Sequence, residues 1–214
     1  MNVTQALYER RSVRAFLPTA VEKEKLTAIF EAAARTPSWA NSQPWEVFVA
    51  TGETLQKIKE AYQKNYDSGT VPSPETARPT EWTQAAIRRR TQLHPGMVRD
   101  CGDAAKNFGL LNKTMFDAPV VAFICMDKLL SQWSLYDIGA YSQSLMLAAI
   151  EHGLGTIPAI TLTHFPEILH RELGIPENLQ VTIGIAIGYI DDGNAINNFK
   201  SARDPVSQTV RFCE

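Results

Sequence analysis

Two short stretches within the first 45 residues hold most of the side chains that could bind a ligand. The first is Arg10-Arg11-Ser12-Val13-Arg14, which places three guanidinium groups and one hydroxyl within five residues. A guanidinium is a planar set of donors that matches phosphate oxygens two at a time. The segment is therefore a candidate anion site, although such a segment taken alone is more often a solvated basic surface.

The second stretch runs from Pro37 to Trp45 and reads Pro-Ser-Trp-Ala-Asn-Ser-Gln-Pro-Trp. It is dense in amide and hydroxyl groups and is framed by two prolines and two tryptophans. This composition suits a rigid loop that hydrogen-bonds a flat heterocycle, and taken alone it could be a structural turn. An anion site followed closely by a heterocycle site indicates a nucleotide-like ligand.

The remaining chemistry-bearing residues give no metal site and no side-chain nucleophile. The four histidines lack the spacing of metal ligands. No motif of a serine hydrolase or of a phosphate-binding P-loop is present. Gly153-Leu154-Gly155 lacks the third glycine of a dinucleotide fingerprint and is interpreted as a helix end. A nicotinamide nucleotide would therefore visit the active site as a substrate.

Composition limits the class of protein. The 214 residues suffice for one well-cored domain or at most two small ones, and 44% apolar with 21% charged residues is ordinary for a soluble globular protein. A net charge of −2 argues against nucleic acid as the main partner. The odd number of cysteines and the absence of a CxxC pair favour a reducing compartment. No apolar run is long enough to span a bilayer, so we expect a cytoplasmic protein with no membrane partner.

Hydrophobic periodicity predicts the elements that position these residues. Helices are predicted at residues 2–9, 19–35, 52–62, 81–94, 99–116, 133–152 and 163–173, and strands at 45–50, 119–126, 156–160 (or a loop), 179–190 and 206–212. Thr19 with Glu22 has the pattern of a capping box, and Pro95-Gly96 separates two of the helices. Small residues along 133–152 indicate a central or interface helix. Periodicity alone predicts one domain of mixed α and β structure.

Residues 65–82 form a long segment with three prolines and no apolar period. Loops of this length inside a compact domain often cover binding sites. The run Arg88-Arg89-Arg90 that follows is interpreted as a solvated helix face rather than as a second anion site.

The two N-terminal stretches, at their observed spacing, resemble the FMN-dependent nitroreductase family, and the insertion with Glu81-Trp82 and an arginine-rich helix resembles its nitrobenzoate-reductase-like branch. The resemblance covers Ala6 to Val210 apart from a variable insertion at about 66–100, within a single domain at 1–214. It implies an α+β fold with a mixed, mostly antiparallel sheet flanked by helices. It also implies an intertwined homodimer with two FMN sites at its interface, in which the tail strand pairs with the partner's sheet.

The resemblance assigns roles to individual residues. Arg10 and Ser12 would hold phosphate and ribityl oxygens, Arg14 would face the N1/O2 edge of the flavin, and Ser38 and Asn41 would reach it from the second subunit. The cofactor-binding residues implied by the resemblance are Arg10, Arg11, Ser12, Arg14, Pro37, Ser38, Trp39, Asn41, Gln43, Asn112, Pro158, Ala159, Ile160, Thr161, Lys200 and Arg203.

The later members of this set have more specific roles. Asn112 would reach the pyrimidine edge. The segment from Pro158 to Thr161 would bring backbone N–H groups near flavin N5, with Ile160 and Thr161 replacing the commoner Glu-Gly pair. Lys200-Ser201-Ala202-Arg203 resembles a second phosphate clamp, of which Arg203 is the preferred member over Lys200 because the spacing differs by one residue from some relatives.

The activity implied by the resemblance is ping-pong reduction: NADH or NADPH reduces the flavin, and a nitroaromatic or quinone is then reduced. No side chain acts as a catalyst; Arg14 and the backbone of Ile160 assist the flavin. Trp39, Trp82 and the insertion would line the acceptor pocket. The alternatives are a flavin-binding sensor or carrier without significant turnover, a flavoenzyme of the same fold that performs reductive dehalogenation or flavin fragmentation, and a basic binding module without flavin. The last is disfavoured for nucleic acid, because aromatic and basic residues are not interleaved along one stretch.

Overall fold

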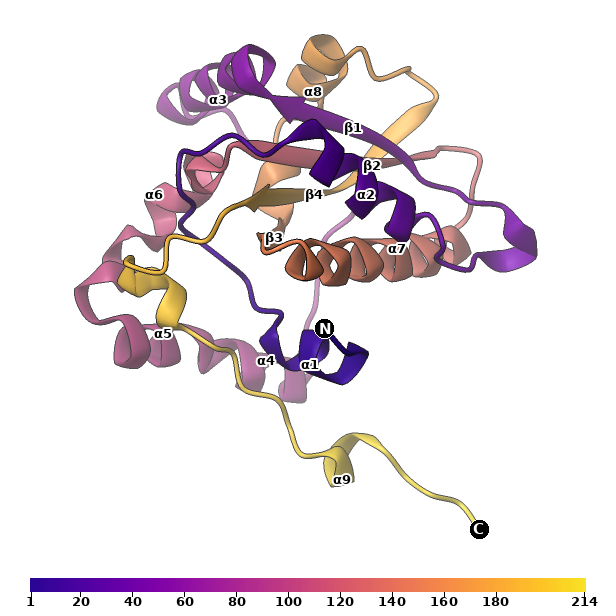
Figure 1. The fold of residues 1–214 in the computed structure, drawn as a ribbon, viewed down its shortest axis with the longest axis vertical. Coiled ribbons are helices and arrows are strands. Elements are labelled where there is room, and N and C mark those ends of the chain that lie inside the picture. Colours follow the sequence, from indigo (N-terminus) through magenta and orange to yellow (C-terminus); the bar gives the residue numbers. More distant parts are fainter.

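A four-stranded antiparallel sheet forms the centre of the protein (Figure 1). The computed structural model describes residues 1–214. The strands are β1 (Glu46–Thr51), β2 (Val120–Asp127), β3 (Gly155–Ala159) and β4 (Leu179–Gly188), in the spatial order β1-β2-β4-β3. Helices cover both of its faces, so the predicted α+β fold is confirmed.

The central strand β2 is buried on both faces. Its residues alternate between two hydrophobic clusters, with Val121 and Phe123 in one and Ala122 and Ile124 in the other. Because neither face meets water from Val120 to Met126, every position there is apolar rather than every second one. The apolar run in the sequence has this cause, and the predicted strand at 119–126 is confirmed within one residue.

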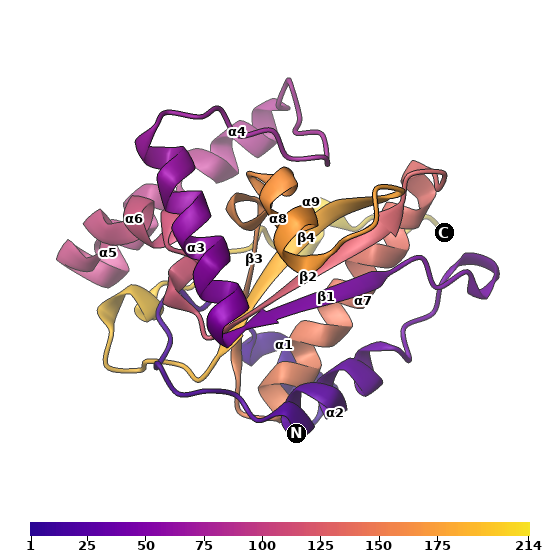
Figure 2. The same cartoon turned by 90° about the horizontal axis from the view of Figure 1, so that it is seen from above.

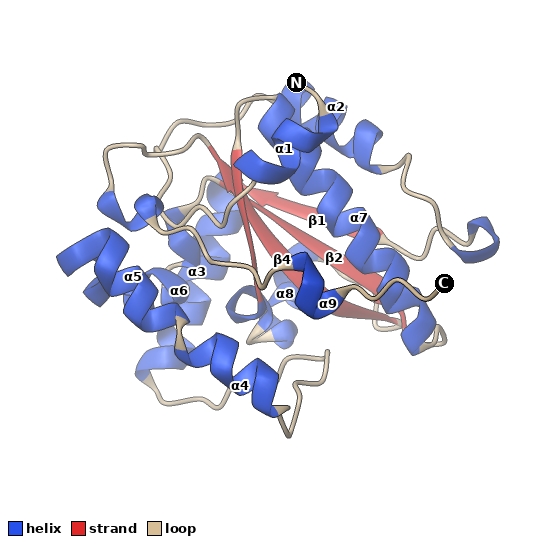
Figure 3. Cartoon of the chain, turned by 90° about the horizontal axis from the view of Figure 1, so that it is seen from below, coloured by secondary structure: helices blue, strands red, loops and turns tan.

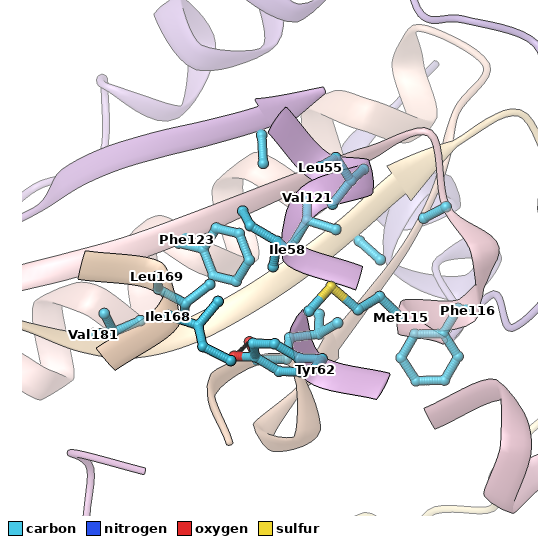
Figure 4. Packing of buried hydrophobic residues seen from close by; sticks show 14 of the residues in the cluster. Leu55, Ile58, Tyr62, Met115, Phe116, Val121, Phe123, Ile168, Leu169 and Val181 are labelled. Atoms are coloured by element: carbon cyan, nitrogen blue, oxygen red, sulfur yellow. Dashed lines mark hydrogen bonds between the residues drawn. The ribbon is translucent and has the colours of Figure 1, made fainter. Parts of the chain in front are cut away.

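Helices α3 (Gly52–Asp67) and α8 (Pro166–Leu173) cover one face of the sheet (Figure 2). In the close view, Ile58 and Tyr62 of α3 and Leu169 of α8 gather against Phe123 of β2 (Figure 4). The Tyr62 hydroxyl donates to the carbonyl oxygen of Leu162 at 2.8 Å, so this buried polar group is satisfied.

The opposite face is covered by α2 (Lys23–Ala33) and the long α7 (Gln132–Glu151), with α1 (Val3–Glu9) leaning on α7 (Figure 3). The apolar stripe of α2 that periodicity predicts, including Leu26 and Ile29, is buried here. The helix at 133–152 is confirmed, and it packs against α2 and the sheet as a central helix. No helix of the structure combines the length and the apolar character needed to cross a membrane.

The chain between α3 and β2 adds a helical layer to one side of the sheet. It consists of α4 (Gln84–Thr91), α5 (Leu93–Cys101), a 3₁₀ helix Gly102–Asn107, α6 (Phe108–Lys113) and a 3₁₀ turn Met115–Asp117. A small third cluster joins this layer to the 3₁₀ helix Ala195–Asn198 near the C-terminus. Ala15 and the segment that contains Ile196 and Phe199 thus meet beside α5.

Two predicted helix boundaries in the first half of the chain were wrong. Pro95 does not separate two helices but lies in the first turn of α5, where its missing N–H has no partner to lose. The chain instead breaks at Gln92 and at Gly102, which has a φ of +55°. Helix α2 begins at Lys23 after Glu22, so Thr19 does not cap it.

The last two corrections concern the ends of predicted elements. Thr163 ends a 3₁₀ helix, Ile160–Thr163, and α8 begins only at Pro166. The predicted strand at 206–212 is absent, because these residues form the single helical turn α9 (Val206–Thr209) and a tail directed away from the body (Figure 1). Within one chain the tail meets no sheet edge that could pair with it.

Candidate functional site

Six predicted ligand residues line one cavity of about 270 Å³. They are Arg10, Arg11, Ser12, Arg14, Lys200 and Arg203. They come from the two ends of the sequence, and no carboxylate group belongs to the wall. A cavity with this lining can bind a phosphate group through charge-assisted hydrogen bonds.

The arginine segment is held in position because it runs beside β3. Ser12 forms a parallel bridge with Thr156, and the Val13 N–H donates to the Thr156 carbonyl at 3.0 Å. Gly155 makes this approach possible: a Cβ there would lie 2.6 Å from Cγ2 of Val13 and 2.7 Å from Cγ1 of Ile190. The arginine segment is therefore held beside β3 by backbone contacts.

Asn197, which no sequence motif indicated, fixes the same segment from the other side. Its Oδ1 accepts from the N–H groups of Arg14 at 2.7 Å and Ala15 at 3.2 Å. Its Nδ2 donates to the carbonyls of Ala15 at 2.8 Å and Asp191 at 2.9 Å. The side chain is buried, so all four of these bonds are shielded from water. A polar residue in a stretch of asparagines near the C-terminus gave no local signal of this role.

The charges in the cavity are not neutralised by the protein. Burial, and then the neighbouring guanidinium of Arg203, lower the pKa of Arg10. The carboxylate of Asp192 lies 3.6 Å from Nη2 of Arg11 but is largely in solvent. Nε of Arg11 is buried without a hydrogen-bond partner. Two cations held this close, with donors left over, favour a bound anion.

Arg14 lies deeper than the other arginines, between two aromatic rings. Its guanidinium carbon is 5.7 Å from the ring centre of Phe108 and 5.3 Å from that of Phe199. Nη1 donates to the carbonyl oxygen of Ser12 at 2.9 Å, whereas the buried Nε has no partner. Burial lowers the pKa of this guanidinium, so the site contains a fixed and poorly hydrated positive charge.

The end of β3 brings the next predicted residues into contact. Pro158 and Ala159 end the strand, and Ile160 and Thr161 begin the 3₁₀ helix that follows. The Thr161 hydroxyl donates to Oδ1 of Asn112 at 3.1 Å, and Nδ2 of Asn112 donates to the Phe108 carbonyl at 2.7 Å. Asn112 and Thr161 therefore form one polar surface, with Phe108 linking it to Arg14.

The loop from Pro37 to Gln43 does not join this site within one chain. Its 3₁₀ turn, Trp39–Asn41, projects at the end of the molecule opposite to α5 and α6 in Figures 1, 2 and 3. The Ser38 hydroxyl oxygen accepts from the Gln43 N–H at 2.9 Å, and the carboxylate of Asp137 accepts from the Trp39 N–H at 3.2 Å. The loop is thus internally braced, although Trp39 is 69% exposed.

The long segment after α3 is attached to the body at several points. The Ser73 N–H donates to the His164 carbonyl at 2.9 Å. Oε2 of Glu75 accepts from the Val181 N–H at 2.7 Å and lies 3.2 Å from Nε2 of His170. Nη2 of Arg78 lies 2.7 Å from Nε2 of His164. The predicted loop at 65–82 begins only after α3 ends at Asp67, and from there it forms a strap over the region between the 3₁₀ helix Ile160–Thr163 and α8.

His164 joins this strap to the end of α3. Its Nδ1 lies 2.9 Å from the hydroxyl oxygen of Tyr66. Burial and then the Arg78 charge lower the pKa of His164 to about 4, and burial raises the pKa of Tyr66 to about 12. Both groups are consequently uncharged at neutral pH.

Comparison with known proteins places this arrangement in context. The family model described as the Nitroreductase family matches residues 7–189. The chain is 32% identical to nitroreductase NfnB of Mycolicibacterium smegmatis, over 95% of this chain and 89% of that protein. It is 29% identical to 4-nitrobenzoate reductase of Pseudomonas putida, over 95% of this chain and 92% of that protein.

A solved structure shares the whole fold. The crystal structure of the FMN and NADPH-dependent nitroreductase NfnB from Sphigopyxis sp. strain HMH has a TM-score of 0.93 to this structure, with 29% identity and 100% of each chain covered. The family match begins within α1 and ends just after β4, so it includes the arginine segment, the whole sheet and the end of β3. By sequence and by structure, the chain belongs to the Nitroreductase family.

Proposed function

We propose that the protein is an FMN-dependent oxidoreductase that uses NADH or NADPH to reduce nitroaromatic or quinone-type acceptors in ping-pong order. The observation that carries the proposal is the convergence of residues 10–14 and 200–203 on one cavity without a carboxylate, beside the end of β3. The printed names of the relatives, nitroreductase and 4-nitrobenzoate reductase, support the acceptor class. The FMN and NADPH dependence of the Sphigopyxis enzyme supports the two cofactors.

The cavity fits the phosphate of FMN. Arg10 and Arg203 repel each other across it, and a dianion placed between them replaces this repulsion by two attractions. Lys200 and the Ser12 hydroxyl add further donors on the same wall. Arg203 remains the preferred partner of the phosphate, because the pKa of Arg10 responds to its charge.

The residues beyond the cavity fit the flavin ring. When bound, FMN supplies the redox chemistry by taking a hydride equivalent from NAD(P)H and passing it to the acceptor. Arg14 holds a buried positive charge, which stabilises negative charge on a nearby ring edge more strongly than a hydrated cation would. Asn112 and the backbone N–H groups of Ile160 and Thr161 provide hydrogen-bonding groups for the rest of the ring.

The second half of the site would come from a second copy of the chain. The loop that contains Pro37, Ser38, Trp39, Asn41 and Gln43 lies far from the cavity of its own chain. A homodimer would place each such loop at the cavity of the partner chain. Edge strand β1 has one unpaired side, and an 880 Å³ groove lies beside it between α2 and α3. The apolar tail side chains Val206 and Phe212 are exposed. Sedimentation velocity should give twice the monomer mass.

The insertion belongs to the same single domain at 1–214 in this proposal. The strap and Trp82 would line the acceptor pocket together with Trp39. Deletion of Gly69–Pro79 should change the ratio of kcat/KM between a nitroaromatic and a quinone, and an unchanged ratio would remove the strap from the pocket. A cytoplasmic location is also part of the proposal, supported by three free cysteines.

The visible absorption spectrum of the purified protein tests the function directly. Flavin bands should bleach on anaerobic addition of NADH or NADPH and return when nitrobenzene or a quinone is added. Flavin bands that neither nucleotide bleaches would favour a sensor or carrier. Return of the bands only with a halogenated aromatic would favour reductive dehalogenation. A colourless protein that does not take up FMN would contradict the proposal.

A further inference from the structure

Among the cationic side chains that line the cavity, Arg14 alone is packed against aromatic rings. Its guanidinium carbon lies 5.7 Å from the ring centre of Phe108 and 5.3 Å from that of Phe199. No carboxylate pairs with this guanidinium, and its buried Nε has no hydrogen-bond partner. The two rings therefore occupy the place that water or an acidic side chain takes beside other arginines.

Phe199 is held by the same segment that holds the backbone of Arg14. It directly follows the 3₁₀ helix Ala195–Asn198, whose Asn197 accepts from the Arg14 N–H at 2.7 Å. Phe199 is 4% exposed and belongs to the third hydrophobic cluster. Helix α5 leaves room for its ring at Gly96, where a Cβ would lie 3.1 Å from Cε2 of Phe199. One short C-terminal segment thus fixes both the backbone and the surroundings of the side chain of Arg14.

Phe108 reaches Arg14 from the helical layer. It is the first residue of α6, and it lies half-buried at the margin of the third cluster. Its carbonyl oxygen accepts from Nδ2 of Asn112 at 2.7 Å, and Oδ1 of the same asparagine accepts from the Thr161 hydroxyl. A half-buried ring at the margin of a cluster adds less to the core than Phe199 does, so packing alone does not account for its position beside a guanidinium.

We propose that Phe108 and Phe199 are positioning residues of the flavin site, which act through Arg14 to raise the reduction potential of bound FMN. This inference rests on the proposed function, in which Arg14 faces the N1/O2 edge of the ring. Reduction by a hydride adds two electrons and one proton, so the neutral ring gains one negative charge. A cation that stabilises this charge makes the reduced form bind more tightly than the oxidised form, which raises the potential.

The rings matter because they keep water away from the guanidinium. Two charges attract each other several times more strongly across a poorly hydrated site than across water. The negative faces of the rings offset part of the Arg14 charge, but water would screen that charge more. The rings also order a long side chain that has one hydrogen-bond acceptor in the protein, the Ser12 carbonyl oxygen at 2.9 Å. Both effects favour the reduced form of the flavin.

Phe108→Leu is the decisive variant. It removes the ring but keeps an apolar side chain, at a half-buried position where the fold should tolerate the change. Phe108→Tyr is the conservative variant, because it retains the ring. Phe48→Leu is the matched control, since Phe48 is a half-buried residue of β1 that packs against the first hydrophobic cluster and forms no cation–π pair.

Titration of the FMN-loaded protein with a chemical reductant, against a redox dye of known potential, measures the midpoint potential without turnover. In Phe108→Leu, the preference for reduced over oxidised FMN should fall about tenfold. This change corresponds to a potential about 30 mV more negative. Phe199→Leu should shift the potential in the same direction. Phe108→Tyr and Phe48→Leu should stay within about twofold of the wild-type preference.

A double-mutant cycle tests whether the ring acts through the guanidinium. In the Arg14→Gln background, Phe108→Leu should leave the potential where Arg14→Gln alone places it. The Kd for oxidised FMN, titrated by flavin fluorescence with the apoprotein, should change by less than about threefold in Phe108→Leu, because the oxidised ring carries no charge for Arg14 to stabilise. A ring that merely supported the fold would weaken the binding of both redox forms alike and leave the potential unchanged.

Three results would overturn the inference. An unchanged potential in Phe108→Leu would show that the ring does not affect the flavin. Equal shifts in Phe108→Leu and Phe48→Leu would assign the effect to a general loosening of the fold. An equal shift with and without Arg14 would show that the ring does not act through it. Failure of NADH and NADPH to bleach the flavin would reject the proposed function only, because the potential is measured with a chemical reductant. A protein that takes up no FMN would overturn both.

Discussion

Replacing Asn197 by alanine should remove the support of the arginine segment without touching any group that would contact FMN. Two backbone N–H groups, those of Arg14 and Ala15, lose their acceptor and stay buried. The carbonyls of Ala15 and Asp191 lose one bond each but keep the N–H groups of Asp191 and Asn194. At about 1.5 kcal/mol for each stranded N–H and about 0.5 kcal/mol for each carbonyl, the free energy of unfolding should fall by about 4 kcal/mol.

Urea unfolding of the apoprotein at one fixed protein concentration measures this loss, with the transition followed by far-UV circular dichroism. Asn194→Ala is the matched control, because its side chain accepts a single bond, from the Ile196 N–H at 3.2 Å. The control should lose about 1 kcal/mol. FMN affinity, titrated by flavin fluorescence, should also fall more in Asn197→Ala than in the control. Equal destabilisation of the two variants would refute the role assigned to Asn197.

Three further outcomes follow from the geometry. Arg203→Ala should raise the Kd for FMN about tenfold or more, since hydrogen bonds to charged groups contribute about 1.5–3 kcal/mol; Arg171→Ala, whose partner is Glu172 on the exposed face of α8, should leave the Kd unchanged in the same fluorescence titration. Gly155→Ala should lower the free energy of unfolding by about 2 kcal/mol, because its Cβ overlaps Val13 and Ile190. Gly109→Ala, with open space around the new methyl, should be neutral or stabilising in the same urea series. His164 has a pKa of about 4 in the fold and 6.5 when unfolded, so the folded state binds fewer protons and stability should fall as the pH drops from 6.5 to 4. Because the ring is only half-buried, solvent screening limits this loss to about 1–2 kcal/mol, and His164→Gln should flatten the pH dependence of the urea midpoint.

The sequence predicted elements best where local pattern and tertiary environment agree. The continuous apolar run of β2 reports burial on both faces, and the stripe on α2 reports burial on one. The prediction that Pro95 separates two helices was wrong because proline is as compatible with the first turn of a helix as with a break between helices. The prediction of a strand at 206–212 was wrong for a different reason. An edge strand needs a partner edge, and within one chain the tail is directed away from the body and pairs with neither edge strand, β1 or β3.

The residues that would bind the ligand could be predicted from the sequence, whereas the residues that hold them in position could not. Several arginines and a serine at close spacing indicate an anion site, because their side chains are donors that match an anion. Asn197 carries no comparable signal, because its partners lie 183 and 182 positions away and only the folded chain brings them together. The aromatic neighbours of Arg14 arrive in the same way, from α6 and from the C-terminal segment. The position of the loop at 37–43, away from the cavity of its own chain, agrees with the expectation that it acts from a second subunit, and that expectation came from the family resemblance and not from the residue pattern.

The contact between Arg78 and His164 determines the tautomer of the His164 ring, and through it the direction of the hydrogen bond between His164 and Tyr66. A guanidinium only donates, so Nε2 of His164 must accept, and the single proton of the neutral ring lies on Nδ1. Nδ1–H therefore donates to the Tyr66 oxygen, which leaves the phenolic hydrogen of Tyr66 directed elsewhere. With its pKa near 12 this hydroxyl keeps its proton. A residue of the insertion thus makes Tyr66 a hydrogen-bond donor toward whatever approaches it, and never a base.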